Sequence, residues 1–365
     1  MSAEPASHAA KPTAFTLVEL MVSTALITLI ALLLVTMTNS TAATWRYTTG
    51  RIEQFRGANN AFESITRRVS QATLNTYWDY LDASGNPRPA NATNWVPKRY
   101  GRASDLRFIT GSMTGGAKKL VTTGSLRRPT HGVFFQAPLG FVDDTTNFGG
   151  LSNLINTWGY YVEFRDDTLV RPTFVTTTLV PARYRYRLME LMQPSNSITI
   201  YGLDSSKVPY NSGKKWFAES LPTSAAAPPV NAPPSPIHVL AENVIAMVVL
   251  PKLSKREETS TGKTLSADYS YDTTSTNTDP DINPKSQLPP IVQVTLVAID
   301  ETSANRIANG STPPAFDATL DTLFLDPKKF DADLATLQKT LTDLRLSSRV
   351  FTSNISIRGA KWSRK

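Results

Sequence analysis

The chain has 365 residues, a formal net charge of +8 and no cysteine. Its length suffices for one large domain or two modest domains. The absence of cysteine excludes disulfides, zinc–thiolate sites, iron–sulfur clusters and cysteine catalysis. The basic residues are dispersed and are not interleaved with aromatic residues, so the sequence contains no specific nucleic-acid-binding motif.

The first element in the chain is an apolar span. Residues 11–37 read KPTAFTLVELMVSTALITLIALLLVTM, a short polar leader followed by that span. One acidic residue, Glu19, lies near its start. An isolated carboxylate is costly to bury in hydrocarbon, and ionisable residues in such segments are usually functional. We therefore interpret Glu19 as a functional group that has a partner.

The residues around Glu19 carry a family resemblance. Lys11, the run AFTLVE at 14–19 and the apolar tail resemble the class III signal of type IV pilins and type II secretion pseudopilins. This resemblance implies that a prepilin peptidase cuts between Ala14 and Phe15 and then methylates the new N-terminus at Phe15. The family usually has Gly where this chain has Ala14, and the basic run of the leader is reduced here to Lys11.

Glu19 has a physical role in this interpretation. Cleavage exposes a cationic amine at Phe15, and pairing it with Glu19 of a neighbouring subunit offsets the cost of both buried charges. The resemblance thus implies that Glu19 fixes the register of a filament. Leu17, Val18 and Leu20 are expected to pack helix on helix in that assembly.

Two other interpretations of the span compete with this one. An ordinary secretory signal peptide would be cleaved near 41–43, but the apolar stretch at 20–37 exceeds the usual ~7–15 residues. A plain signal anchor would tolerate Glu19 without using it. Arg46, Arg51 and Arg56 follow the span, which by charge count would place the C-terminal part in the cytoplasm. The pilin-type signal implies the opposite, so we expect a single-pass inner-membrane protein with a periplasmic head.

Beyond the span, the pattern predicts one helix from about Thr16 to about Leu74. No proline interrupts the run from 14 to 85, and the apolar face consists of Ile52, Phe55, Phe62, Ile65 and Val69. The expected organisation is a leader at 1–14, a transmembrane and filament-core helix at 15–38, an amphipathic continuation at 39–85 and a head at 86–365.

The head is predicted to be rich in β-strands. Strand-like runs lie at 105–110, 131–136, 158–165, 183–191, 239–250, 291–299 and 349–358. In the run 183–191, RYRYRLMEL, Arg183, Arg185 and Arg187 alternate with Tyr184, Tyr186, Leu188 and Glu190, which predicts an antiparallel sheet with one solvated face. A helix is expected after Pro327 on Phe330, Leu334, Leu337, Leu341 and Leu344. The fold class is therefore α+β, with a proline-rich loop at 222–236 and a polar, mobile loop at 253–290.

Candidate chemistry in the head is sparse. The histidines outside the leader are His131 and His238, too few for a multi-histidine metal site. The glycine-rich run 111–119 has its lysine one residue late for a phosphate loop and favours a hairpin turn. Asp279, Asp281 and Asn283 are spaced like calcium ligands, but the loop lacks the shaping glycine and has Pro290 at position twelve. The sequence predicts no enzyme and no cofactor. Asp279, Asp281 and Asn283 remain weak candidates for calcium ligands.

The remaining segments extend the resemblance. Residues 61–75 resemble the end of the first helix in J-type minor pseudopilins of type II secretion. Segments 131–141, 240–253, 288–304 and 349–363 resemble the Verru_Chthon cassette protein C family. The resemblance implies a minor pseudopilin that works with a prepilin peptidase and other pilins, at the filament tip because its head is bulky. The alternative is a membrane-anchored envelope binding protein that never polymerises.

Overall fold

The computed structural model describes residues 16–85, 87–89, 93–115, 118–122, 124–168, 171, 174–175, 178–224 and 235–362. The chain forms two compact units, residues 1–54 and 55–365, which we describe separately. In the first unit α1 (Leu17–Gln54) is one continuous helix. The second unit begins at Phe55, whereas the sequence pattern placed the start of the head at residue 86.

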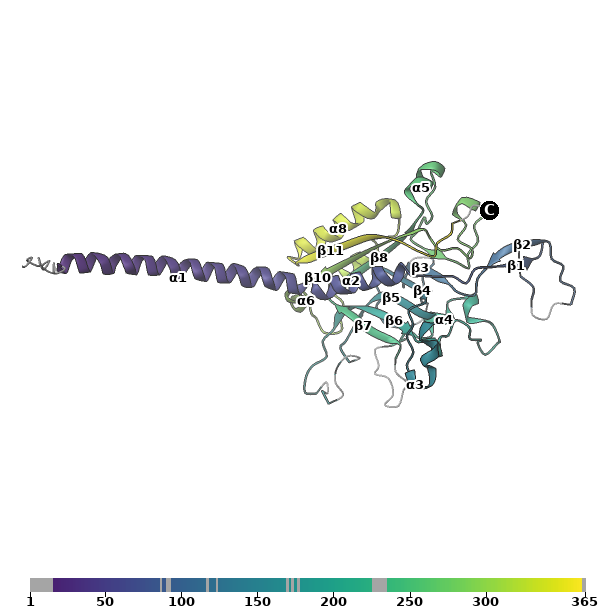
Figure 1. Cartoon of the computed structure of the whole chain (residues 1–365), viewed down its shortest axis with the longest axis horizontal. Coiled ribbons are helices and arrows are strands. Elements are labelled where there is room, and N and C mark those ends of the chain that lie inside the picture. The colour runs from purple at the N-terminus through teal and green to yellow at the C-terminus, as the bar shows by residue number, and fades with distance from the viewer. Residues whose placement is uncertain are drawn as a thin grey trace, which may run out of the picture. The chain divides into compact units, whose positions relative to one another are not determined.

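The second unit is built on two antiparallel sheets (Figure 1). The larger sheet has the strand order β7-β6-β5-β4-β3-β9, with β3 (Phe108–Ser112), β4 (His131–Ala137), β5 (Asn156–Arg165), β6 (Arg185–Gln193), β7 (Ile237–Glu242) and β9 (Tyr271–Asp272). The smaller sheet has the order β11-β10-β8, with β8 (Val244–Lys252), β10 (Ile291–Ile299) and β11 (Ser348–Ser356). The predicted α+β class with antiparallel sheets is confirmed.

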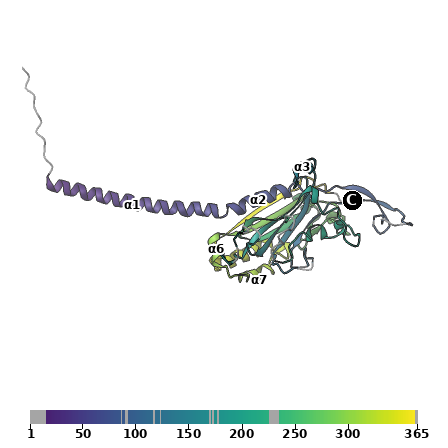
Figure 2. The same ribbon diagram turned by 90° about the horizontal axis from the view of Figure 1, so that it is seen from below.

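Helices and a separate ribbon complete this unit. β1 (Tyr77–Leu81) and β2 (Arg99–Ala103) form a two-stranded ribbon that extends away from both sheets (Figures 1 and 2). The α-helices are α2 (Arg56–Val69), α3 (Thr145–Phe148), α4 (Lys215–Ala218), α5 (Lys255–Thr261), α6 (Glu301–Arg306), α7 (Asp317–Leu320) and α8 (Phe330–Asp343). The 3-10 turns are Gly149–Asn153, Ser195–Ser197, Tyr210–Ser212, Pro280–Ile282 and Pro327–Lys329. The helix predicted on the leucine repeat is confirmed by α8, which buries Leu337 and Leu341.

The helix α2 packs against both sheets. Its buried residues, Ala58, Ala61, Ile65 and Val69, recur every three or four positions and so form one face. This face contacts β4 and β7 of the larger sheet and β10 and β11 of the smaller one. Beside it, the ring of Phe62 lies 5.9 Å from that of Phe351 in β11. α2 therefore closes the apolar core that the two sheets share.

An ion pair fixes α2 on the larger sheet. Arg68 Nη1 donates to Glu190 Oε2 of β6 and, at 3.1 Å, to the hydroxyl of Tyr160 on β5. Its guanidinium lies 4.1 Å from the ring centroid of Trp158. The side chain of Glu190 is only 11% exposed, so its charged form depends on Arg68. Burial nevertheless raises the pKa of Glu190, against the attraction of Arg68.

The chain passes from one sheet to the other at Asn243. The sequence pattern predicted a single strand at 239–250, and this prediction is wrong because β7 ends at Glu242 and β8 begins at Val244. Asn243 has a φ of 61°, a left-handed conformation that asparagine tolerates better than most residues. Its backbone N–H donates to Tyr186 O in the larger sheet, while its carbonyl accepts from Ile299 N in the smaller one.

The long N-terminal helix is shorter than predicted. It is interrupted at Phe55, whose ring is buried, and α2 stops at Val69 instead of continuing to Leu74 or through 39–85. After Val69, the Ser70 carbonyl accepts from Arg358 N, so the end of the helix is bonded to the segment after β11. The aromatic run that follows forms β1 instead of helix.

Two further predictions about the head are wrong. The arginine face of β6 is not solvated, because Arg185 and Arg187 are buried beneath residues from distant segments. The region 253–290, predicted as one polar loop, contains regular structure. It contains α5, which is capped reciprocally by Ser254 and Glu257, and it buries Leu265 among other residues.

The Arg68–Glu190 pair gives a stability prediction. Arg68→Met should lower the free energy of unfolding by about 3 kcal/mol, because it leaves a buried carboxylate without its counter-charge. Arg67→Met, at the exposed neighbouring position, should change it by less than about 0.5 kcal/mol. The measurement is denaturant unfolding of the full chain in detergent. In the double variant Arg68→Met/Glu190→Leu most of the stability should return, and a loss larger than that of Arg68→Met alone would contradict an unpaired charge as the cause.

Candidate functional site

The N-terminal part of α1 is long and apolar enough to cross a membrane. The candidate span, Leu17–Thr41, has 25 residues. At ~1.5 Å per residue it would be about 38 Å long, more than the ~30 Å hydrocarbon core of a bilayer. Leu17, Val18 and Leu20, the predicted packing residues, are 76%, 69% and 60% exposed. An apolar helix exposed on all sides requires lipid or other helices to cover it.

The polar side chains of this span are largely satisfied within the helix. Hydroxyls donate to carbonyl oxygens three or four residues earlier in the same helix, at 2.7–3.0 Å; the donors are Ser23, Thr24, Thr28, Thr36 and Thr38. Such bonds allow hydroxyl groups to be buried in hydrocarbon. Between Leu17 and Thr41, Glu19 is the single charged residue.

Glu19 also makes a local interaction within its own helix. Its backbone N–H donates to Thr16 Oγ1 at 3.3 Å, and its carboxylate accepts from Thr16 N at 3.5 Å. This reciprocal arrangement is a capping box, which satisfies N–H groups at the start of a helix. The pattern T-x-x-E at 16–19 was the available signal. Ala14 and Phe15, the predicted processing residues, lie outside the described residues.

A lysine occupies the predicted calcium loop. Lys263 Nζ lies 2.6 Å from Asp279 Oδ2 and 2.9 Å from Asp281 Oδ2. Asn283 Oδ1 accepts from two backbone N–H groups of its own loop, those of Asn277 and Lys285. Within the described residues no group of three or more acidic or histidine side chains is placed to hold a metal ion.

The other predicted candidates are separated in the head. His238 is exposed on β7. Gly111 and Ser112 of the glycine-rich run belong to β3, and Lys118 pairs with Asp268 at 3.1 Å. The run thus leads out of β3 into the connection to β4, and two of its residues, 116 and 117, lie outside the described residues.

His131 joins the two sheets. Its Nδ1 accepts from Val249 N of β8 at 3.2 Å, so its Nε2 carries the proton and lies 3.0 Å from Phe324 O. The preceding Thr130 accepts from Met247 N through its Oγ1. The ring is 2% exposed, and burial lowers the pKa of His131 from 6.5 to about 4. His131 is therefore neutral where it connects β4 of the larger sheet to β8 of the smaller one.

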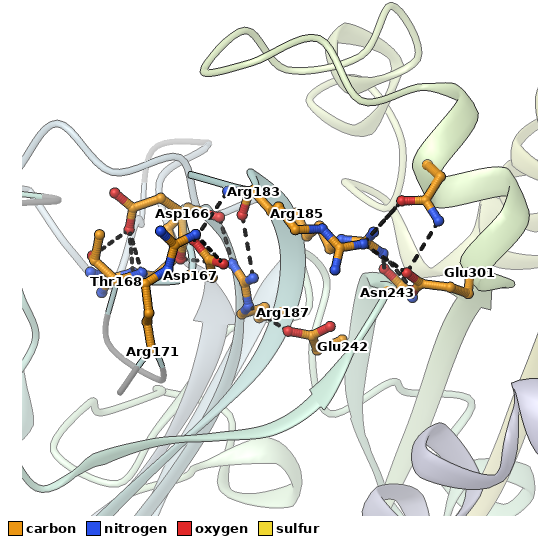
Figure 3. A network of polar contacts seen from close by, with 12 residues as sticks. Asp166, Asp167, Thr168, Arg171, Arg183, Arg185, Arg187, Glu242, Asn243 and Glu301 are labelled. Atoms are coloured by element: carbon orange, nitrogen blue, oxygen red, sulfur yellow. Dashed lines mark hydrogen bonds and ion pairs between the residues drawn. The ribbon is translucent and has the colours of Figure 1, made fainter. Parts of the chain in front are cut away.

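Sequence reasoning missed an arginine cluster where β6 begins (Figure 3). Arg187 Nε lies 3.1 Å from Glu242 Oε1 at the end of β7, and Arg171 Nη2 lies 2.8 Å from Asp167 Oδ2. A second part of the cluster centres on the carboxylate of Glu301 in α6. That carboxylate accepts from Arg183 Nη2 at 3.0 Å and Arg185 Nη1 at 2.5 Å.

A cavity of about 340 Å³ adjoins this cluster, lined by Arg171, Arg183, Arg185, Arg187, Asp167 and Glu242 together with two valines. The alternation in RYRYR was the sequence signal for it. The alternation by itself predicts a solvated face, but Glu242 and Glu301, which are remote in sequence, pair with these arginines.

Comparison with known proteins adds no relative to these observations. No family model matches the chain, and neither a curated protein nor a solved structure matches it.

The position of His131 predicts a pH dependence of stability. The unfolded chain takes up the proton first, because the pKa of His131 is 6.5 when unfolded and about 4 when folded. The free energy of unfolding should therefore fall as the pH drops from about 6.5 to about 4, by about 3 kcal/mol from this group. His131→Gln should abolish that part of the slope in denaturant titrations, and His238→Gln should retain it. Equal slopes in wild type and His131→Gln would refute the assignment.

Proposed function

We propose that the chain is a minor pseudopilin-like subunit of a type II secretion or type IV pilus-like machine. In this proposal α1 inserts into the inner membrane, a prepilin peptidase cuts between Ala14 and Phe15, and the head lies in the periplasm. The single observation that carries the proposal is the lone carboxylate of Glu19 at the start of an otherwise apolar, fully exposed span. A helix that served only as an anchor would be more stable in lipid without that charge.

The assembly step follows from the chemistry of the span. After cleavage, the amine of Phe15 and the carboxylate of Glu19 lie near one end of an apolar helix. In a bundle of such helices, each amine is paired with the carboxylate of a neighbour, while Leu17, Val18 and Leu20 pack between helices. Association in lipid relies on packing and polar contacts, because lipid chains are as apolar as leucine. The charge pair therefore supplies the register that the apolar contacts lack.

The proposed position is the tip of a short filament. The head comprises residues 55–365, with two sheets, a protruding ribbon and long connections. A unit of this size repeats poorly along a thin fibre, whereas one copy at an end meets no such restriction. Quantitative mass spectrometry of isolated fibres tests the position, and abundance equal to that of the main subunit would exclude a tip role.

A membrane-anchored binding protein that never polymerises is the second candidate. The capping box favours it, because Thr16 gives Glu19 a role within its own helix and removes the need for a partner subunit. The two candidates differ in what they require of Glu19. Filament assembly requires its charge, and the capping box requires only an acceptor at this position.

The first test is the N-terminus of the protein isolated from membranes of its native host. We expect the mature chain to begin at N-methylated Phe15, because peptidase recognition depends on the leader and the start of the span. Intact mass and N-terminal sequencing measure this directly. A chain that begins near Ala43 or Thr44 would instead identify a secreted protein and overturn the filament proposal.

Substitution at Glu19 separates charge from capping. Glu19→Gln keeps an acceptor for the Thr16 N–H but removes the charge, because glutamine also serves in capping boxes. It should reduce filament-associated protein by at least about tenfold, equal to ~1.4 kcal/mol of assembly free energy, at unchanged membrane abundance. Thr16→Val removes the cap, keeps the charge and should assemble normally. Normal assembly of Glu19→Gln would favour the non-polymerising anchor.

A further inference from the structure

The arginine cluster at the start of β6 surrounds a cavity that carries an excess of positive charge. Four guanidinium groups and two carboxylates line the cavity of about 340 Å³. Glu301, which pairs with Arg183 and Arg185 from outside the lining, brings the negative charges to three and leaves a formal excess of one positive charge. The side chains of Arg171, Arg185 and Arg187 are only 7%, 4% and 1% exposed. Charges held this far from water are stable only when counter-charges and hydrogen bonds compensate them.

The buried guanidinium groups are held in place by the backbone. Arg187 Nη1 donates to Arg165 O at 2.6 Å and to Asp166 O at 2.8 Å. Arg171 donates to the carbonyl oxygens of Val180, at 2.5 Å, and Pro181, at 3.0 Å. These bonds fix the orientation of both groups without any ligand. A ligand that binds them therefore meets a small cost for ordering the site.

Donors around the cluster outnumber their acceptors. Arg165 is opposite Arg185 in the β5–β6 ladder and is 1% exposed. Its Nε and Nη2 have no hydrogen-bond partner among the described residues, although Asp166 Oδ1 lies 4.0 Å from Nε. Arg183, which lines the cavity, is 53% exposed and uses only Nη2 in the described hydrogen bonds. Unused N–H groups thus remain on the buried Arg165, which is opposite Arg185, and on the exposed Arg183, which lines the cavity.

The carboxylates that compensate these arginines are partly open to water. The side chains of Glu242 and Glu301 are 43% and 48% exposed, whereas their partners Arg187 and Arg185 are buried. A partly solvated carboxylate loses little by turning outward. An incoming oxyanion can then replace it as the acceptor for a guanidinium that cannot move.

The geometry points to a binding site for a phosphate ester in this cavity, held by Arg183 and Arg187 with Arg171 behind them. Guanidinium groups match the oxygens of a phosphate in pairs, which an ammonium group cannot do. The cavity lies at the small end of the ~300–1,000 Å³ range of ligand pockets, which suits a phosphate with a short attached group. The inference does not depend on filament assembly.

Two sources share this chemistry, a soluble phosphate ester and the headgroup of a phospholipid. The network includes Glu301 of α6, and α6 lies at the end of the head where α2 begins (Figures 1 and 2). Residue 55 at that end is joined directly to the helix that contains the membrane-span candidate. Both sources are therefore included in the test.

The test is an isothermal titration of the detergent-solubilised full chain with glycerol 3-phosphate, in which calorimetry measures binding at constant ionic strength. We expect saturable binding that Arg183→Gln weakens by about tenfold or more, since it loses a charged donor. Arg183 is half exposed, so this variant should fold. Glu242→Gln should strengthen binding severalfold, because it removes the competing carboxylate. Arg256→Gln, an exposed arginine on α5, is the matched control and should bind like wild type.

The outcomes are distinct. The site is supported if the affinity for glycerol 3-phosphate falls in Arg183→Gln and rises in Glu242→Gln. It is refuted if wild type shows no saturable binding, or if both variants bind more weakly. For the lipid source, the chain is placed in bilayer discs of phosphatidylcholine with and without phosphatidylglycerol. If glycerol 3-phosphate binds equally in both discs, the ligand is soluble. If phosphatidylglycerol competes with glycerol 3-phosphate in wild-type discs, the lipid headgroup occupies the cavity. Phosphatidylglycerol retained by the protein, measured by native mass spectrometry, should then fall in Arg183→Gln and stay unchanged in Arg256→Gln.

Discussion

The seating of α2 across the two sheets is the constraint on which the head depends. Its small apolar face brings both sheets onto one core, and Arg68 fixes it to the larger sheet through Glu190. Because α2 directly follows the helix with the membrane-span candidate, any load on that helix reaches the head through these contacts. The ion pair at Arg68 resists sliding along the sheet, which apolar contacts alone resist less well because they are non-directional. The interactions that stabilise the head thus also hold the segment that follows the membrane-span candidate in the chain.

The two sheets are joined by a few polar groups at defined positions. Asn243 passes hydrogen bonds to both sheets, and Thr130 and His131 supply side-chain acceptors for the outer edge of β8. Asn243 also accepts from Arg185 and donates to Glu301. The same residue therefore belongs both to the contacts between the sheets and to the arginine cluster. A ligand that changes the ion pairs of Glu301 would therefore act next to the point where the sheets meet.

The sequence predicted what depends on local pattern. The apolar span, the strands at β4, β5, β6 and β10 and the helix α8 each follow from periodicity or composition within one segment. The break at Asn243 was missed because the segment 239–250 is apolar apart from Glu242 and Asn243, and an asparagine also occurs within strands. The buried arginines were missed because their charges are compensated by remote residues: Glu242 is 55 residues from Arg187, and Glu301 is 116 residues from Arg185. Pattern gives the face on which a side chain lies, and only the fold determines what covers that face.

The hydroxyl groups of α1 donate to carbonyl oxygens of their own helix, and this affects the direction from which another helix can pack against α1. The outer surface of Leu17–Thr41 then presents almost only alkyl groups, so it is nearly uniform around its circumference. Such a cylinder has no preferred side toward lipid or toward another helix. In the proposed filament, the one carboxylate therefore sets the direction in which a neighbouring helix lies, and moving that carboxylate by one position would rotate this direction by about 100°.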